Sequence, residues 1–147
     1  MRLYAKDVRD ILLNFLRSNL NNKIEELRAK YNIVDLCKIK SFNNVLDYAF
    51  LPVLIVTVNS GKQVEDRKNN NAELYNVTIE IYVKEIDFNV LQDILDCYEE
   101  AIKSLLNYAI EEFTYIRYID HNKGFLVEEK KGTTWSGIMF NFEVRVN

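Results

Sequence analysis

The closing segment of the chain, TTWSGIMFNFEVRVN, alternates between apolar and mixed side chains, and this pattern constrains the fold more than any other feature. From Ile138 to Val146 every second residue is apolar. The residues between them are Met139, Asn141, Glu143 and Arg145. Successive side chains of a strand point to opposite faces of its sheet, so the alternation predicts a strand with one dry face and one mixed face. An apolar layer must therefore cover one face of that sheet.

Two amphipathic helices are predicted to supply this layer. In residues 6–31, apolar side chains recur every three or four positions from Val8 to Leu27. Asn21 and Asn22 weaken the middle of this helix, and a kink or break is expected there. A stronger stripe predicts a second, long helix over residues 87–110. Each helix has a single apolar stripe, so each can cover the sheet on one side only.

Four further strands are expected. VLIVTV (53–58) and NVTIEIYV (76–83) flank a polar segment, residues 59–75, which is expected to be a long exposed loop or the extended tip of a hairpin. After the second helix, TYIRYID (114–120) and GFLVEEK (124–130) flank the turn-like HNKG and, with the closing segment, make three C-terminal strands. Residues 32–51 are compatible with a short strand, a one-turn helix or an irregular loop.

The continuous apolar run VLIVTV indicates a strand that is buried on both faces or lies at an oligomer interface. Two helices on one side of a sheet cannot cover its other face. The run therefore favours assembly, in which identical copies of the chain supply the missing cover.

A chain of 147 residues is expected to form a single domain with one sizeable core. Strands joined by short turns are antiparallel. The pattern as a whole predicts an α+β fold, a two-layer sandwich of a mostly antiparallel sheet with two amphipathic helices on one face.

Composition excludes several functional classes. The net charge is −3 with acids and bases interspersed, so a nucleic-acid-binding stripe is not expected. The longest apolar run is too short to span a bilayer and contains Pro52, and no signal peptide is recognisable, so no membrane contact is expected. Cys37 and Cys97 are expected to be reduced, buried thiols in a cytoplasm.

No catalytic, cofactor or metal site is predicted. His121 is the only histidine, which excludes paired-histidine metal sites, and it is expected to be solvated at a turn tip. Acidic neighbours on its helix should raise the pKa of Cys97 and keep its thiol from acting as a nucleophile. Trp135 is expected to be a core or interface anchor rather than a ligand platform. The chain is therefore not expected to be an enzyme.

The mixed face of the sheet and the long loop remain as candidate protein interfaces. Amphipathic aromatic area surrounded by polar groups is typical of protein–protein contacts, although an ordinary solvated sheet face has the same composition. The predicted interface residues on the sheet are Tyr82, Met139, Asn141, Glu143 and Arg145. Those in the loop are Lys62, Glu65, Asp66, Arg67 and Lys68.

The whole layout resembles the tail-terminator (tail-completion) and neck proteins of long-tailed bacteriophages and of phage-derived contractile particles (tailocins). The segments that carry this resemblance follow in chain order: VRDILLNFLRSNL, LPVLIVTV, a long polar hairpin loop, YNVTIEIYVKE running into VLQDILDCYEEAIKSLL, and TWSGIMFNFEVRV. Residues 32–51 match nothing in the family.

The resemblance implies a structural protein whose copies form a closed ring, usually a hexamer, on the last ring of the tail tube. Such a ring ends tube growth and offers a docking surface to a head connector, collar or sheath, while DNA only passes through the lumen. It also implies assembly in the cytoplasm, followed by incorporation into a phage or phage-tail-like particle. A head–tail connector, a minor tail protein, or a small α+β ligand-binding or regulatory module with a pocket near Trp135 are the alternatives.

Overall fold

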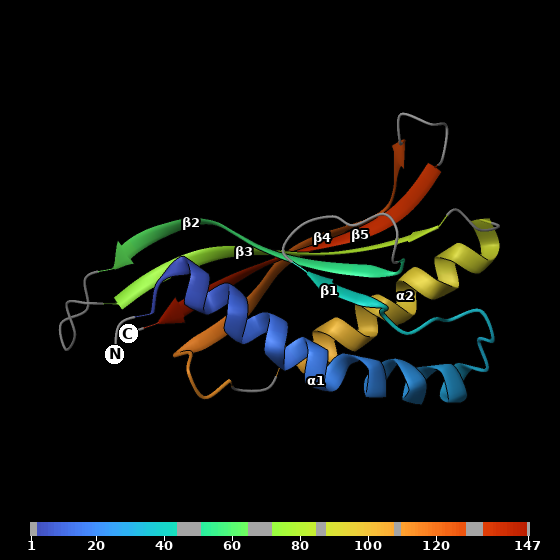
Figure 1. The fold of residues 1–147 in the computed structure, drawn as a ribbon, viewed down its shortest axis with the longest axis horizontal. Coiled ribbons are helices and arrows are strands. Elements are labelled where there is room, and N and C mark those ends of the chain that lie inside the picture. Colours follow the sequence, from blue (N-terminus) through green and yellow to red (C-terminus); the bar gives the residue numbers. More distant parts are fainter. Residues whose placement is uncertain are drawn as a thin grey trace.

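The computed structural model describes residues 3–43, 51–64, 72–84, 88–107, 110–128 and 134–146. Its elements are α1 (Ala5–Tyr31), β1 (Ser41–Asn43), β2 (Val53–Val64), β3 (Ala72–Lys84), α2 (Phe88–Leu105), β4 (Tyr115–Glu128) and β5 (Thr134–Val146). Both helices lie on the same side of one five-stranded sheet (Figure 1). The predicted α+β class and two-layer arrangement are confirmed.

Helix α1 runs without interruption through the position where a break was expected. Its buried stripe from Val8 to Leu27 follows the predicted spacing. The side chain of Asn21 hydrogen-bonds to a residue outside the helix, and these bonds offset the low helix propensity of asparagine. Its Nδ2 donates to the Ile39 carbonyl at 3.0 Å, and its Oδ1 accepts from the Ile39 N–H at 2.8 Å. The asparagine thus fastens the segment after α1 to the helix.

Helix α2 ends at Leu105, earlier than the predicted residue 110, and packs its stripe against the other half of the sheet. Tyr98 is fully buried in this stripe, and its hydroxyl donates to the Cys37 carbonyl at 2.8 Å. Helix α1 contacts β1 and β2, whereas α2 contacts β4 and β5. The two helices therefore cover different halves of the sheet, one at each edge.

The strand order is β1-β2-β3-β5-β4, with one parallel pair (β1–β2) and antiparallel pairs elsewhere. Of the two expectations for residues 59–75, a long loop is wrong in extent and the extended hairpin is confirmed, because β2 continues to Val64 and β3 begins at Ala72. Cross-strand pairing holds this hairpin even though its residues lack the apolar alternation that reveals a strand in sequence. A bulge between Val58 and Ser60 shifts the register within it.

The expected three C-terminal strands are two, because HNKG lies inside one long strand, β4. Gly124 has φ +81°, a left-handed conformation that glycine adopts without steric cost, and the register shifts between Lys123 and Phe125. Glycine here makes a bulge and not a turn. His121 is accordingly a strand residue, and its predicted place at a turn tip is wrong.

The main core lies between the helices and the sheet, and a second apolar cluster lies on the other face. Its members are Leu51, Val53, Ile55, Tyr82 and Trp135. Val53 and Ile55 are 0% and 5% exposed within the single chain. Residues 53–56 are thus buried on both faces as predicted, whereas Thr57 is exposed and Val58 is half-buried. The expectation that neighbouring copies must cover the second face at Val53 and Ile55 is wrong. Residues from three separate segments converge there to do so.

Candidate functional site

In the described part of the chain, both edges of the sheet lack a partner strand over long stretches. β4 is outermost on one side, and no described strand pairs with its outer edge. On the other side, β1 pairs only with Val53 to Ile55, so from Val56 to Val64 the edge of β2 that faces away from β3 has no described strand beside it. Edge strands present unpaired N–H and C=O groups that can pair with another chain. These two edges are the most prominent candidate binding surfaces among the described residues.

The open edge of β4 exposes two large apolar side chains. Tyr118 is 38% exposed and Ile119 is 48% exposed. Ile119 occupies the bulge at which the register with β5 shifts between Tyr118 and Asp120. Natural proteins usually protect edge strands with charge or proline, so apolar side chains on an open edge favour a contact with another chain.

An ion-pair cluster joins this edge strand to α2. Lys123 of β4 donates from Nζ to Glu99 Oε1 at 2.8 Å and also bonds Asp96, while Lys103 donates to Glu99 Oε2 at 2.9 Å. Burial by itself would raise the pKa of Glu99, but the hydrogen bonds from Lys123 and Lys103 outweigh it and lower that pKa to about 2. Glu99 is therefore a charged counter-ion that fastens α2 onto β4.

His121 belongs to the same cluster. Its Nδ1 hydrogen-bonds with the Tyr118 hydroxyl, and its Nε2 lies 3.4 Å from Glu99 Oε1. The imidazole is thus held between a phenol and a carboxylate that two ammonium groups already neutralise. Because Glu99 is paired in this way, it is poorly suited to activate the histidine as a base. The expectation that His121 is solvated is wrong, because its side chain is 25% exposed and lies against Glu99 of α2, a neighbour that is distant in sequence.

The two thiols differ in their surroundings. Cys97 is buried, and its pKa is raised first by burial and then by Glu100, Asp96 and Asp93, as its acidic context predicts. Cys37 is exposed, which corrects the expectation that both thiols are buried. Within the described residues no three acidic, histidine or cysteine side chains are grouped to hold a metal ion. No described helix is long and apolar enough to cross a membrane.

An open groove of about 960 Å³ runs between α2 and β4. Its floor is apolar, with Leu106, Ile116 and Phe142, and Tyr118 stands at the β4 edge. Its rim is charged and includes Asp96, Glu99, Glu100, Lys103, Lys123 and Arg117. A groove with this composition fits a protein segment that offers both an apolar side chain and a charge.

The mixed face of the sheet is a hydrogen-bonded chain of side chains across four strands. Asn59 Nδ2 donates to Thr78 Oγ1 at 2.6 Å, and Thr78 donates to Asn141 Oδ1 at 3.0 Å. Asn141 Nδ2 in turn donates to Asp120 Oδ1 at 2.6 Å. Polar groups satisfied by one another present a flat surface that costs little to leave in water.

Glu143 forms a second polar group on this face. Its Oε2 accepts from Arg117 Nη2 at 2.6 Å and from the Tyr115 hydroxyl at 3.1 Å. Burial and then this hydrogen bond raise the pKa of Tyr115, so the phenol remains a donor. The pairing restrains all three side chains.

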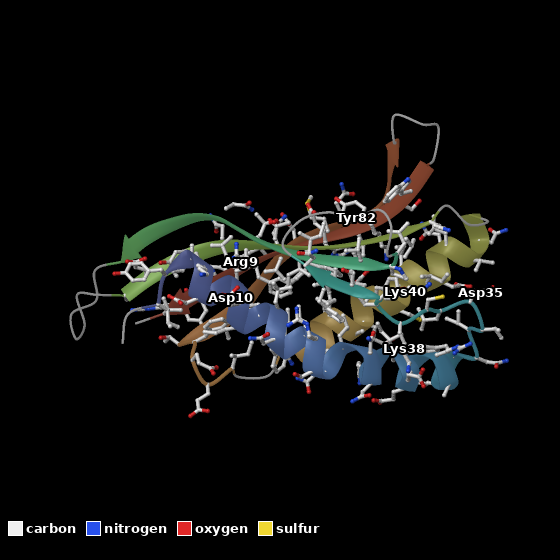
Figure 2. The ribbon with its side chains drawn as sticks, viewed as in Figure 1. Arg9, Asp10, Asp35, Lys38, Lys40 and Tyr82 are labelled. Carbon is white, nitrogen blue, oxygen red and sulfur yellow. The ribbon has the colours of Figure 1, made fainter. Side chains whose placement is uncertain are left out.

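The predicted interface residues fall into three groups. Met139, Asn141, Glu143 and Arg145 share the mixed face of β5 and are half-buried, as the alternation predicts. Tyr82 is on the sheet side away from α1, but it is largely buried in the second apolar cluster (Figure 2). Residue 62 lies in β2, where its side chain is not described, and residues 65–68 lie outside the described residues. Their proposed contacts therefore remain predictions.

No protein-family model and no curated protein matches the chain. The solved structures that match include a chain from "Virion of native gene transfer agent (GTA) particle". It shares 13% sequence identity, with a TM-score of 0.49, over 89% of this chain and 93% of that chain. A likeness this weak does not establish function.

Proposed function

We propose that the chain is a structural protein of a phage or phage-tail-like particle, and that its copies form a closed ring that caps the tail tube and ends its growth. The observation that supports this proposal is the open β4 edge on one side of the sheet and the open part of β2 on the other. A subunit with two different free edges can bind head to tail, and such contacts make a ring when the rotation closes.

Strand direction favours this contact. Each step from β2 to β3, β5 and β4 is antiparallel, so β2 and β4 run in opposite directions. Rotation about a ring axis preserves strand direction along that axis. β4 of one copy would therefore meet β2 of the next in an antiparallel pair, which continues the alternation inside the sheet.

The surfaces away from the edges would serve the rest of the particle. The segment between β2 and β3 carries Glu65, Asp66, Arg67 and Lys68, with Lys62 just before it, and we assign it to contact with the tail tube, sheath or connector. The ring has no catalytic step, and DNA would only pass through its lumen. Six copies are expected from the resemblance of the layout to tail terminators.

The edge contact is tested by placing a charge on it. Ile119→Lys should convert a multimer into a monomer, because an ammonium group on the β4 edge would have to be desolvated at the contact. Val34→Lys is the matched control, since Val34 is 71% exposed and lies outside the sheet. Sedimentation velocity at increasing concentration and negative-stain microscopy provide the readouts.

A ring for the wild type and the Val34 variant, with a monomer for the Ile119 variant, supports the proposal. A wild-type chain that stays monomeric at millimolar concentration overturns it and favours the ligand-binding alternative. A stable dimer that Ile119→Lys dissociates would instead indicate a symmetric β4–β4 contact, which closes without a ring.

The tube contact requires a separate variant. Replacing Glu65, Asp66, Arg67 and Lys68 by serine should leave self-association unchanged and abolish co-sedimentation with tail tubes. Unchanged binding of this variant to tubes would remove the segment from the proposed interface.

A further inference from the structure

Resting on the proposed ring, we propose that the groove between α2 and β4 receives the first turns of α1 from the neighbouring copy. Tyr4 would enter over the apolar floor of the groove, and Lys6 and Arg9 would meet Asp96 and Glu100, the rim carboxylates that keep exposed area. The contact would hold the helical layer together across the copy boundary, beside the pairing of the two sheet edges.

The start of α1 has the chemistry that the groove requires. Tyr4 is 60% exposed, an unusual degree for a large aromatic side chain. Lys6 and Arg9 line a shallow hollow against Val56, Thr57 and Val58, which belong to the open part of β2. Two cations thus lie at the sheet edge that the ring would join to β4, and the exposed Tyr4 directly precedes Ala5, which lines the same hollow.

The two surfaces lie at the same level of the sheet. Val58 of β2 pairs with Val77 of β3, Val77 pairs with Phe142 of β5, and Phe142 pairs with Tyr118 of β4. This row starts beside the first turns of α1 and ends in the groove, because Phe142 and Tyr118 both line it. Edges that pair without stagger would therefore bring α1 of one copy to the groove of the next.

The charges of the two helices are complementary. Helix α1 has six basic and four acidic side chains, a net charge of +2, whereas α2 has four acidic and one basic, a net charge of −3. Since α1 covers the β2 side and α2 the β4 side, the copy boundary places a basic helix beside an acidic one. Opposite charges of this kind fix register and accelerate association.

The same helices already use this chemistry within one chain. Near the end of α1, the Tyr31 hydroxyl donates to Glu100 Oε1 at 3.1 Å, and Lys30 Nζ lies 3.8 Å from the same oxygen. Tyr4 and Lys6 repeat the pairing of tyrosine and lysine at the opposite end of the helix. Glu100 also lines the groove, so α2 would be bound by α1 of its own chain on one side and by α1 of the neighbour on the other.

Charge reversal tests this contact in the full chain. Lys6→Glu combined with Arg9→Glu should weaken ring association about tenfold at low salt, with the difference shrinking as salt is added. Asp96→Lys, at the rim of the groove, should weaken association in the same way. Combining the three substitutions should restore much of the lost association, because the opposite charges again face each other.

Lys38→Glu is the matched control, because it reverses an exposed cation that lies toward the opposite end of α1 from Arg9 (Figure 2). Tyr4→Ala probes the apolar part of the contact and should weaken association with little dependence on salt. Circular dichroism of each variant verifies that the fold is intact.

Failure of this inference is distinguishable from failure of the proposed function. If the Lys6 and Arg9 reversals leave association unchanged while Ile119→Lys abolishes it, the edges pair but α1 does not enter the groove. A loss of association that the added Asp96→Lys does not restore also overturns the assigned pairing. A wild-type chain that never associates overturns both proposals.

Discussion

Replacing Gly61 by alanine tests how firmly the far end of the β2–β3 hairpin is packed. A Cβ at Gly61 would lie 2.7 Å from Cε1 and 3.0 Å from Cδ1 of Tyr75, well inside ordinary contact distance. The ring cannot easily move away, because Tyr75 is buried and its hydroxyl bonds both the Leu3 carbonyl, at 3.2 Å, and Glu73. The variant therefore overpacks a restrained aromatic side chain.

The size of the effect follows from two opposing contributions. Overpacking of a well-packed site costs about 1–3 kcal/mol, while replacing a strand glycine by alanine gains roughly 0.5–1 kcal/mol. Gly61→Ala should therefore lower the free energy of unfolding by about 1–2 kcal/mol, and the melting temperature by roughly 2–8 °C for a chain of this size. Urea denaturation at low protein concentration measures this without a contribution from self-association.

A second background identifies the cause. With Tyr75→Leu the clash is gone, so Gly61→Ala should become neutral or stabilising in that background, and the cycle should report a coupling of at least about 1 kcal/mol. If Gly61→Ala is as stable as wild type, or destabilises equally in both backgrounds, the Tyr75 ring does not restrain this position and the reasoning is wrong.

Two further predictions concern charges and amides. Because the pKa of Glu99 falls from 4.5 to about 2 on folding, its stabilisation is present above about pH 5 and is lost as pH falls toward 2. Solvent screening limits this contribution to roughly 1–2 kcal/mol. Glu99→Gln should therefore reduce the dependence of the urea unfolding midpoint on pH between about pH 5 and pH 2. If the midpoint of the variant falls with pH as steeply as that of the wild type, the assigned pairing of Glu99 with Lys123 and Lys103 is wrong. Asn21→Leu should lower the free energy of unfolding by about 1–3 kcal/mol, because it removes the hydrogen bonds to the N–H and C=O groups of Ile39. Asn22→Leu is the control and should lower it less. Equal losses for the two variants in urea denaturation would show that the bonds to Ile39 do not stabilise the fold.

Periodicity predicts the elements that have one apolar face along most of their length. The closing strand, the strand centred on Ile79 and both helical stripes are located by apolar spacing alone, even though Tyr82 and Trp135 also bury the second face at one end of β3 and β5. Apolar spacing does not predict the ends of β2 and β3 at the hairpin tip. Residues there, such as Lys62 and Glu73, each pair with the opposite strand through the backbone, and backbone pairing produces no periodic pattern of side chains.

A glycine between two apolar segments can mark a turn or a β-bulge, and the sequence alone does not distinguish the two. Asn122 and Gly124 have the composition of a hairpin turn, and the same residue types make a bulge inside β4. The choice depends on whether β5 extends far enough to pair with both sides, which is a long-range property. The contact of His121 with Glu99 follows from that choice and could not be predicted before it.

The apolar run VLIVTV does not by itself require a neighbouring copy. Sequence indicates correctly that residues 53–56 are buried on both faces, but it cannot show that Tyr82 and Trp135 gather over the second face. Uncovered apolar surface is therefore not what favours association. The open strand edges favour association, and they can be identified only when the strand order is known.

The bulges of this sheet are confined to its flanks. Pairing between β3 and β5 is continuous, whereas β2 shifts register after Val58 and β4 shifts after Tyr118 and again after Lys123. Bulges bend and twist the strand that contains them. Changes in the outer strands β2 and β4 alone would thus alter the angle between adjoining subunits. Inserting or removing one residue in these strands would change the circumference of an assembly and leave the β3–β5 pairing unchanged.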